Sequence, residues 1–273
     1  MTGWRKAWHG VVLLATGSVL VLVAACTTSP TGREQLVVLP DDQMNSMGRQ
    51  QFKQIKQEKP VERNPAVNRY VRCVALAVAR QAEDDTGVSE WEVVVFKDDT
   101  ANAFALPGGK IGVHTGLLGV AETPDQLAAV LGHEVGHVIA RHGNERVSQA
   151  LGVQLGLATA SAAMGDSENR GLVLGALGLG AQYGVLLPYG RTQESEADTI
   201  GQRLMAEAGF DPRAAVQLWR NMEQAGGQSP PEFLSTHPSH SSRIRALQRG
   251  VDDALPLYRR AQNQGRSPDC PTP

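Results

Sequence analysis

The chain has 273 residues, 41% of them hydrophobic, which is enough to bury one good-sized core. Its 26 basic and 28 acidic side chains leave a net charge of −2, so no basic excess exists to attract a polyanion and we expect no nucleic-acid partner. No repeat with the period of helical arrays appears, and we expect a single domain over residues 41–262.

The first 25 residues are typical of a secretory signal peptide. Arg5 and Lys6 form a basic start, and residues 11–25 form an uncharged apolar run of 15 residues, shorter than the roughly 20 that span a bilayer. The sequence VAAC, ending at Cys26, resembles the lipobox of bacterial lipoprotein precursors, so we expect a lipid on Cys26. The alternative is an uncleaved anchor; both place the protein on the periplasmic face of a bacterial membrane. Thr27, in place of the Asp associated with inner-membrane retention, favours the outer membrane.

Helices and a few short strands are expected after the N-terminal region. Asn64 and Pro65 suit the cap and the first position of a helix. We expect a polar tether over 26–40, helices over 41–59 and 64–83, strands over 91–96 and 110–114 around the Gly108-Gly109 turn, and an edge strand near Ala103. The fold class is then α+β, mainly helical, with a small antiparallel or mixed sheet.

The clearest motif is His133-Glu134-Val135-Gly136-His137, on an expected helix. Thr123 can cap that helix, Pro124 suits its first position and Gln126 completes a T-x-x-Q capping box. Two histidines four residues apart leave the same helix face and can reach one ion. H-E-x-x-H is a zinc pattern in which the glutamate deprotonates a water molecule. The alternative is a chance match on an ordinary amphipathic helix.

A third ligand must come from elsewhere, because a catalytic zinc keeps three protein ligands and one open position. The extended pattern with a third histidine is excluded, since Ala140 and Gly143 occupy its glycine and histidine positions. His142 lies about 140° further round a continuous helix than His137. We expect it to lie on the surface or to support a ligand.

A later acidic stretch offers a carboxylate ligand. Glu194 and Asp198 are four residues apart and share a helix face, whereas Glu196 points elsewhere. Glu194 could bind the metal while Asp198 accepts a hydrogen bond from the far nitrogen of a ligating histidine. The alternative is an acidic first turn that the helix dipole favours.

Together these residues resemble the gluzincin metallopeptidases that include the CAAX prenyl endoprotease, the HtpX heat-shock protease and the bacterial periplasmic lipoprotein proteases. The stretch from Asn102 to Gly109 resembles the strand of that family that binds substrate backbone. The stretch from Thr236 to Arg243 resembles its H-P block. The resemblance covers roughly residues 40 to 250.

The resemblance implies a zincin-like metalloprotease domain with one Zn²⁺ per chain. It implies that His133, His137 and Glu194 bind zinc, that Glu134 takes the proton of the water and that Asp198 orients a ligand. His237 would stabilise the oxyanion, with Arg243 supporting His237 or the substrate. Asn102, Ala103 and Phe104 would bind the substrate backbone. His240 competes with His237 for its role, and a histidine before proline is also a common turn residue.

The activity implied is hydrolysis of internal peptide bonds in misfolded or envelope proteins, in periplasmic quality control. Two other classes stay open: a zinc-bearing scaffold or chaperone for outer-membrane protein assembly, and a structural lipoprotein with a degenerate site. Peptide substrates, a membrane reached through the lipid, a second copy of the chain and the envelope assembly machinery are the partners considered.

Two features have two interpretations each. Cys73 and Cys270 form a disulfide, or both are thiols with Cys270 in a flexible tail over 263–273. The Gly- and Ala-rich segment 151–190 is a tightly packed helical hairpin, or it is a lid that faces a membrane or a second copy.

Overall fold

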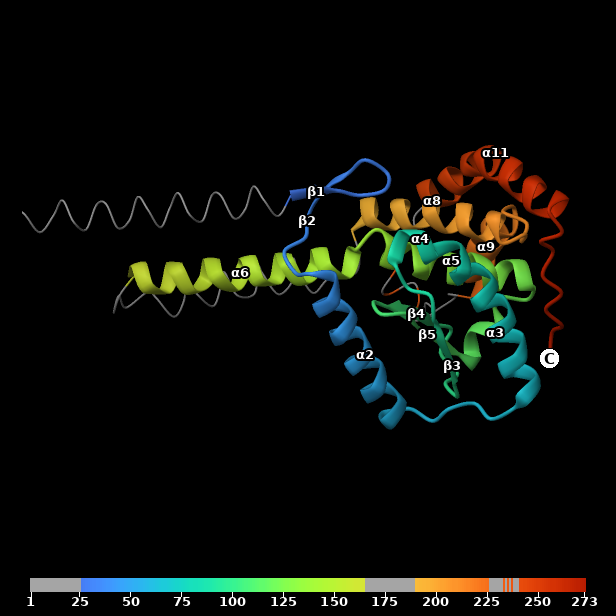
Figure 1. Ribbon diagram of the computed structural model, residues 1–273, viewed down its shortest axis with the longest axis horizontal. Helices are drawn as coiled ribbons and strands as arrows, with labels where there is room; N and C mark the ends of the chain where they lie inside the picture. The colour runs from blue at the N-terminus through green and yellow to red at the C-terminus, as the bar shows by residue number, and fades with distance from the viewer. Residues whose placement is uncertain (1–25, 165–189, 226–232, 234, 236, 238–240) are drawn as a thin grey trace, which may run out of the picture.

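The computed structural model describes residues 26–164, 190–225, 233, 235, 237 and 241–273 (Figure 1). Its main sheet contains β3 (Glu92–Phe96), β4 (Ala103–Leu106) and β5 (Lys110–His114), in the order β3-β5-β4. β3 is parallel to β5, and β4 is antiparallel to it. The expected mixed sheet is confirmed, with β4 at an edge among the described strands.

The turn between β4 and β5 requires glycine. Gly108 and Gly109 have φ angles of 80° and 74°, in the left-handed region that residues with a Cβ rarely adopt. This tight connection pairs Phe104 with Gly112. Because Gly112 has no side chain, the Phe104 ring lies directly over it, where a Cβ would come within 2.3 Å of the ring.

Helices make up most of the protein, as expected. They are α2 (Asp41–Glu58), α3 (Pro65–Ala79), α4 (Glu83–Thr86), α5 (Pro124–Ile139), α6 (His142–Met164), α8 (Arg191–Glu207), α9 (Ala214–Ala225) and α11 (Ser241–Asn263), with 3₁₀ turns η1 (Arg80–Ala82) and η2 (Thr115–Gly119). No helix in the described ranges has both the length and the apolar character of a membrane span.

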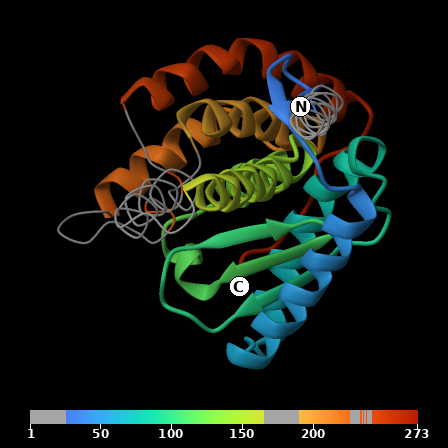
Figure 2. The same cartoon turned by 90° about the vertical axis from the view of Figure 1, so that its left-hand side faces the viewer.

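Helix α5 occupies the centre of the protein. It packs against α3, α8, α9 and the edge strand β4, and α8 packs in turn against α11. Figure 2 shows the sheet on one side of the molecule, with α8 and α11 in layers beyond it. The core beneath α5 consists of fully buried aliphatic side chains, among them Val71, Val74, Val78, Val95, Ile111, Leu127 and Leu131.

The predicted helix over 64–83 is shorter in the structure. Its start agrees with the prediction, because the Asn64 side chain accepts a hydrogen bond of 2.9 Å from the Ala66 backbone. Its end differs: α3 stops at Ala79, and the chain continues through η1 and α4 to Gly87. Gly87 has a φ of 65°, which ends the last turn.

The predicted tether over 26–40 is a structured part of the protein. Residues 26–36 form a hairpin of β1 (Cys26–Thr28) and β2 (Glu34–Leu36), with the exposed Cys26 at its start. Arg33, between the two strands, pairs with Glu145 of α6 and Glu196 of α8. These buried carboxylates need a cation, and Arg33 holds the hairpin against both helices.

The C-terminal tail, predicted to be flexible over 263–273, is attached to α3. A disulfide joins Cys73 to Cys270, which is buried. Arg266 of the tail also donates to the Gln81 side chain, just after α3, at 3.1 Å. Of the two interpretations of these cysteines, the structure contains the disulfide.

The Gly- and Ala-rich segment 151–190 falls only partly within the described residues. Its described part continues α6, which extends away from the body in Figure 1. Leu151 and Leu155 are 43% and 66% exposed. The second half of the segment, residues 165–189, lies outside the described residues, so neither interpretation is tested.

Candidate metal centre

Helix α5 presents the H-E-x-x-H motif inside the protein. The Thr123 hydroxyl caps the helix by accepting from the Gln126 backbone at 3.2 Å, and the Gln126 side chain accepts from the Glu122 backbone at 2.7 Å. The helix is surrounded by other elements, so His133, Glu134 and His137 are only 3–4% exposed. All three point into one buried region.

Small residues bring α8 against this motif. A Cβ on Gly132 would lie 2.6 Å from the Gly201 carbonyl, and one on Gly136 would lie 2.8 Å from the Ala197 carbonyl. The two helices therefore touch backbone to backbone, which only residues without large side chains permit. This contact brings Glu194 and Asp198 of α8 beside the two motif histidines.

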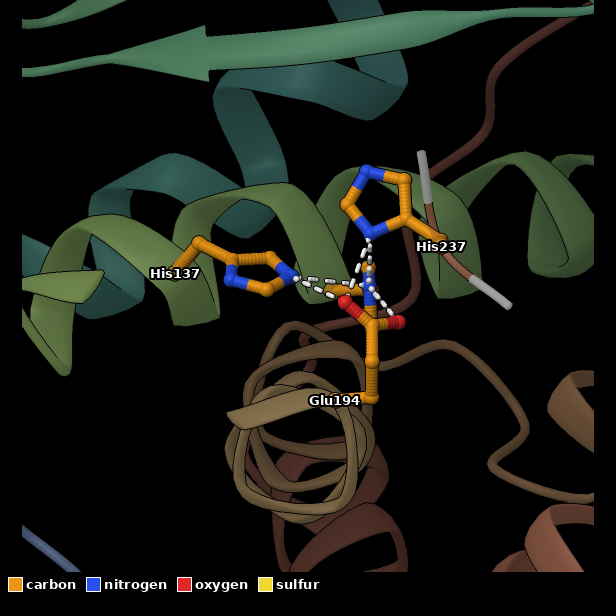
Figure 3. A group of neighbouring side chains, drawn as sticks. His137, Glu194 and His237 are labelled. Atoms are coloured by element: carbon orange, nitrogen blue, oxygen red, sulfur yellow. Dashed lines mark hydrogen bonds and ion pairs between the residues drawn. The ribbon is translucent and has the colours of Figure 1, made fainter. Parts of the chain in front are cut away.

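Four donor groups meet at this point: His133, His137, Glu194 and His237. Figure 3 shows His137, Glu194 and His237 pointing toward one another from α5, α8 and the segment before α11. The Nε2 atoms of His133 and His137 are 3.0 Å apart, and each lies 3.5 Å from a Glu194 oxygen. His237 Nδ1 is 3.1 Å from His133 Nε2 and 3.0 Å from Glu194 Oε1.

These separations fit a zinc ion. Zinc bonds of about 2.0–2.1 Å in a tetrahedron place the ligand atoms about 3.3–3.4 Å apart, and the separations of 3.0–3.5 Å, which involve both oxygens of Glu194, bracket that value. Three imidazole nitrogens and one carboxylate oxygen are also donors that zinc accepts. Residue types and spacing therefore both favour zinc.

The electrostatics around two of the donors, Glu194 and His137, suit a cation. Burial alone would raise the pKa of Glu194, but the three surrounding histidines lower it well below the ordinary value, so this carboxylate stays ionised. Burial lowers the pKa of His137 and favours the neutral ring that a metal ligand requires. Both groups hold the protonation state that binds metal.

Asp198 and Arg243 support the cluster. Asp198 Oδ1 is 2.9 Å from His133 Nδ1, on the side of the ring away from Glu194. Arg243 is 1% exposed; it donates from Nε to Asp198 at 2.6 Å and pairs through Nη1 with Glu194 at 2.7 Å, while its guanidinium lies 3.6 Å from the ring centre of Trp219. The structure thus places Arg243 between Glu194 and Asp198, in addition to a 3.5 Å contact with the His237 carbonyl.

Glu134 is the buried carboxylate next to the cluster. Burial raises its pKa above the ordinary value. His237 Nε2 lies 3.5 Å from Glu134 Oε1, and within the described part of the chain this oxygen accepts no hydrogen bond. A buried acceptor without a donor is costly unless a further molecule supplies one. A water molecule or a substrate group beside Glu134 would supply that donor.

Of the three residues predicted to bind substrate backbone, the structure turns Ala103 toward the open edge of β4. The Asn102 carbonyl accepts from the His114 backbone at 3.0 Å, so Asn102 faces β5. The direction of the backbone N–H and C=O groups alternates along a strand. Those of Phe104 therefore also face β5, and those of Ala103 and Ala105 face outward. The Ala105 backbone N–H indeed points to Glu134 and lowers its pKa. The Phe104 ring packs against Phe52, Phe96 and His114.

His142 takes the second of its two predicted positions, as a support of a ligand. It is fully buried, with Nδ1 2.8 Å from His137 Nδ1, so it does not lie on the surface. The helical-wheel argument fails because α5 ends at Ile139 and Arg141, at a φ of 56°, starts a new helix direction. A left-handed arginine has no local signal in the sequence. His240, the competitor of His237, lies outside the described residues.

Comparison with known proteins gives an independent line of evidence. A family model described as Peptidase family M48 matches residues 65–251. The mitochondrial metalloendopeptidase OMA1 of Schizosaccharomyces pombe is 41% identical over 175 residues, covering 62% of this chain and 50% of that protein. The mitochondrial OMA1 metalloendopeptidase of Danio rerio is 33% identical, covering 94% and 57% respectively.

A bacterial relative is more distant in sequence. The beta-barrel assembly-enhancing protease of Escherichia coli is 26% identical over 260 residues, covering 88% of this chain and 53% of that protein. The chain spans about half the length of these relatives. The family match covers most of the chain and contains all four donors, so the chain belongs to peptidase family M48.

Proposed function

We propose that the chain is a zinc endopeptidase that hydrolyses internal peptide bonds. The observation that carries this proposal is the buried cluster of three histidines and Glu194 beside a buried carboxylate, Glu134, whose Oε1 has no donor among the described residues. Membership of a peptidase family supports the same conclusion.

In this proposal His133, His137 and Glu194 hold the ion, and Asp198 orients the His133 ring. A zinc ion at this position would act as a Lewis acid that polarises a carbonyl, and it would lower the pKa of a water molecule toward 7. Glu134 accepts a proton from the attacking water and passes it to the leaving amine. Its raised pKa brings the carboxyl closer to the working pH, as a group that both takes and gives a proton requires.

His237 would stabilise the oxyanion of the attacked carbonyl. Three protein donors suffice for a catalytic zinc, and His237 is the fourth, so its Nδ1 occupies the place that a substrate carbonyl oxygen needs. The ring must turn aside when a peptide enters. An N–H of the displaced ring is then close enough to donate to that oxygen.

The peptide would bind along β4. The outward-facing backbone of Ala103 and the carbonyl of Ala105 can pair with an extended chain, while the Ala105 N–H donates to Glu134. A cavity of about 420 Å³ continues from this edge past His137, with Met44, Met47 and Val147 among its lining residues. The apolar part of its lining suits large hydrophobic side chains, which unfolded proteins expose and folded ones bury, whereas Asp41, Asp85 and Arg141 add charges to the same lining.

We propose an envelope location for this activity, with a signal peptide over 1–25 and a lipid on Cys26 at the periplasmic face of a bacterial outer membrane. The lipobox-like VAAC and the name of the Escherichia coli relative support this proposal, whereas other relatives are mitochondrial. Cys26 is exposed, as a residue that carries a lipid requires. Mass spectrometry of the mature N-terminus tests it: a chain that keeps residues 1–25 contradicts the lipidation.

The decisive experiment compares cleavage of unfolded casein by the wild type and by Glu134→Gln, with zinc content measured in both. We expect the variant to keep one zinc per chain and to lose at least about 100-fold in kcat, because the amide cannot accept the proton. His133→Ala and Glu194→Ala should lose the metal as well. Full activity of zinc-loaded Glu134→Gln would contradict the proposal.

A scaffold role in outer-membrane protein assembly is the second candidate. The observation that favours it is the name of the Escherichia coli relative, which refers to β-barrel assembly. A cell phenotype of the deletion that zinc-loaded Glu134→Gln rescues would favour the scaffold. Failure of the rescue would favour the peptidase.

A further inference from the structure

The two motif histidines are held in different ways. His133 has the Asp198 carboxylate directly against its Nδ1, at 2.9 Å. His137 has another imidazole there: its Nδ1 lies 2.8 Å from Nδ1 of His142. His142 Nε2 in turn lies 3.1 Å from Glu196 Oε2. An imidazole thus separates the second motif histidine from its carboxylate.

Metal binding determines which nitrogen carries the proton in His137 and in His142. His137 directs Nε2 to the donor cluster, 3.0 Å from His133 Nε2, so its Nδ1 must carry the proton of the neutral ring. His142 Nδ1 must then accept that hydrogen bond, which leaves the proton of His142 on Nε2, facing Glu196. His137 therefore donates to His142, and His142 donates to Glu196.

Glu196 is held by the N-terminal hairpin. Arg33 Nε donates to Glu196 Oε2 at 2.9 Å, and the Thr31 hydroxyl donates to Oε1 at 2.6 Å. Arg33 also grips both oxygens of Glu145 at 2.8 Å. The Glu196 carboxylate, which accepts the hydrogen bond of His142, is thereby bound to residues far from α8 in sequence.

We propose that Arg33, Glu196 and His142 form a positioning relay that orients His137 for metal binding, which makes the hairpin loop between β1 and β2 a working part of the metal centre. The inference rests on the proposed function, because it requires a metal at the donor cluster. It assigns a role to two residues, Glu196 and Arg33, that do not reach the ion. All members of the relay are positioning residues.

A purely structural role is the competing explanation, since Glu196 and Glu145 are buried and need a partner in any case. The two explanations predict different effects on zinc binding. A structural ion pair changes the stability of the metal-free protein, whereas a relay also changes zinc affinity and ligand geometry in protein that remains folded.

The test uses the full-length protein and three variants, His142→Phe, Glu196→Gln and Arg33→Gln. Zinc affinity is measured by competition with a chromophoric chelator, ligand geometry by the visible spectrum of cobalt-substituted protein, and folding by thermal unfolding without metal. Matched controls are His114→Phe, a buried histidine of β5 beside Thr100, and Arg203→Gln, an arginine in an exposed pair with Asp85.

We expect His142→Phe to lower zinc affinity by about 10- to 100-fold and to alter the cobalt spectrum. Glu196→Gln and Arg33→Gln should give smaller losses in the same direction, and both controls should bind zinc as the wild type does. His142→Asn, which places an amide oxygen near the former Nδ1, should recover part of the affinity.

A double-mutant cycle gives the sharpest criterion. Arg33→Gln should lower zinc affinity in the wild-type background and have no further effect in His142→Phe, because the relay is already broken. Folded His142→Phe that binds zinc within twofold of the wild type, with an unchanged cobalt spectrum, overturns the relay. If His142→Phe does not fold, Arg33→Gln decides by the same criterion. Failure of the proposed function differs, since the wild type itself would then bind no zinc or Glu134→Gln would stay active.

Discussion

Gly201 of α8 lies against the backbone of His133 in α5, so that a Cβ at residue 201 would stand 2.5 Å from the His133 nitrogen. The closeness of these two helices places Glu194 beside His133 and His137. The metal centre therefore depends on residues that carry no functional group.

Substitution of this glycine should damage the centre. Gly201→Ala forces α8 away from α5, and we expect a loss of about 1–3 kcal/mol in the free energy of unfolding together with weaker zinc retention. Urea unfolding and zinc content after dialysis measure the two effects. Gly156→Ala, on an open part of α6 with no atom within 4 Å, is the matched control and should be neutral or slightly stabilising. A Gly201→Ala protein that matches the wild type in both assays would contradict this packing argument.

Arg243 pairs with both Glu194 and Asp198, through different nitrogens of its guanidinium group. Arg243→Met leaves Asp198 and Glu194 buried without their cation, and we expect it to cost about 3–5 kcal/mol in the free energy of unfolding. Arg243→Lys should recover only part of that loss, because an ammonium lacks the planar fork that reaches both carboxylates. Equal stability of the lysine variant and the wild type in denaturant unfolding would count against the bridging role.

The disulfide should stabilise the protein through the long loop it closes. Cys73 and Cys270 are 197 residues apart in sequence, and we expect Cys73→Ala with Cys270→Ala to lower the free energy of unfolding by about 2–5 kcal/mol. A reducing agent should lower wild-type stability by a similar amount and leave the double variant unchanged. If reduction affects both proteins equally, the stabilisation has another source.

Asp98 should make stability depend on acidic pH. Lys59, and then Thr100, lower the pKa of Asp98 below its ordinary 3.8 in the folded protein. The stabilisation is therefore complete above the unfolded-state value and is lost as the pH falls through the folded-state value. We expect Asp98→Asn to be less stable than the wild type at pH 7 and the difference to shrink below about pH 4. Asp99→Asn, the next residue, is the control; a difference for Asp98→Asn that stays constant with pH would refute the linkage.

Part of this protein is determined by local sequence. The cap at Thr123, the proline at 124 and the spacing of His133 and His137 specify α5 and the shared direction of the two rings, because helix geometry depends on neighbours within a few residues. The glycines at 108 and 109 specify the β4–β5 turn in the same way. A readable signal was also missed: Gly132 and Gly136 on α5, with Ala197 and Gly201 on α8, place small residues one turn apart on both helices.

The remainder is decided by tertiary structure. No local rule predicts that Arg141 adopts a positive φ, and this single residue decides between the two predicted positions of His142 by placing it behind His137. The position of Arg33 on Glu196 joins groups 163 residues apart in sequence. Such contacts exist because buried charges must find partners wherever the packed helices leave them, a condition set by the whole fold rather than by any segment of it.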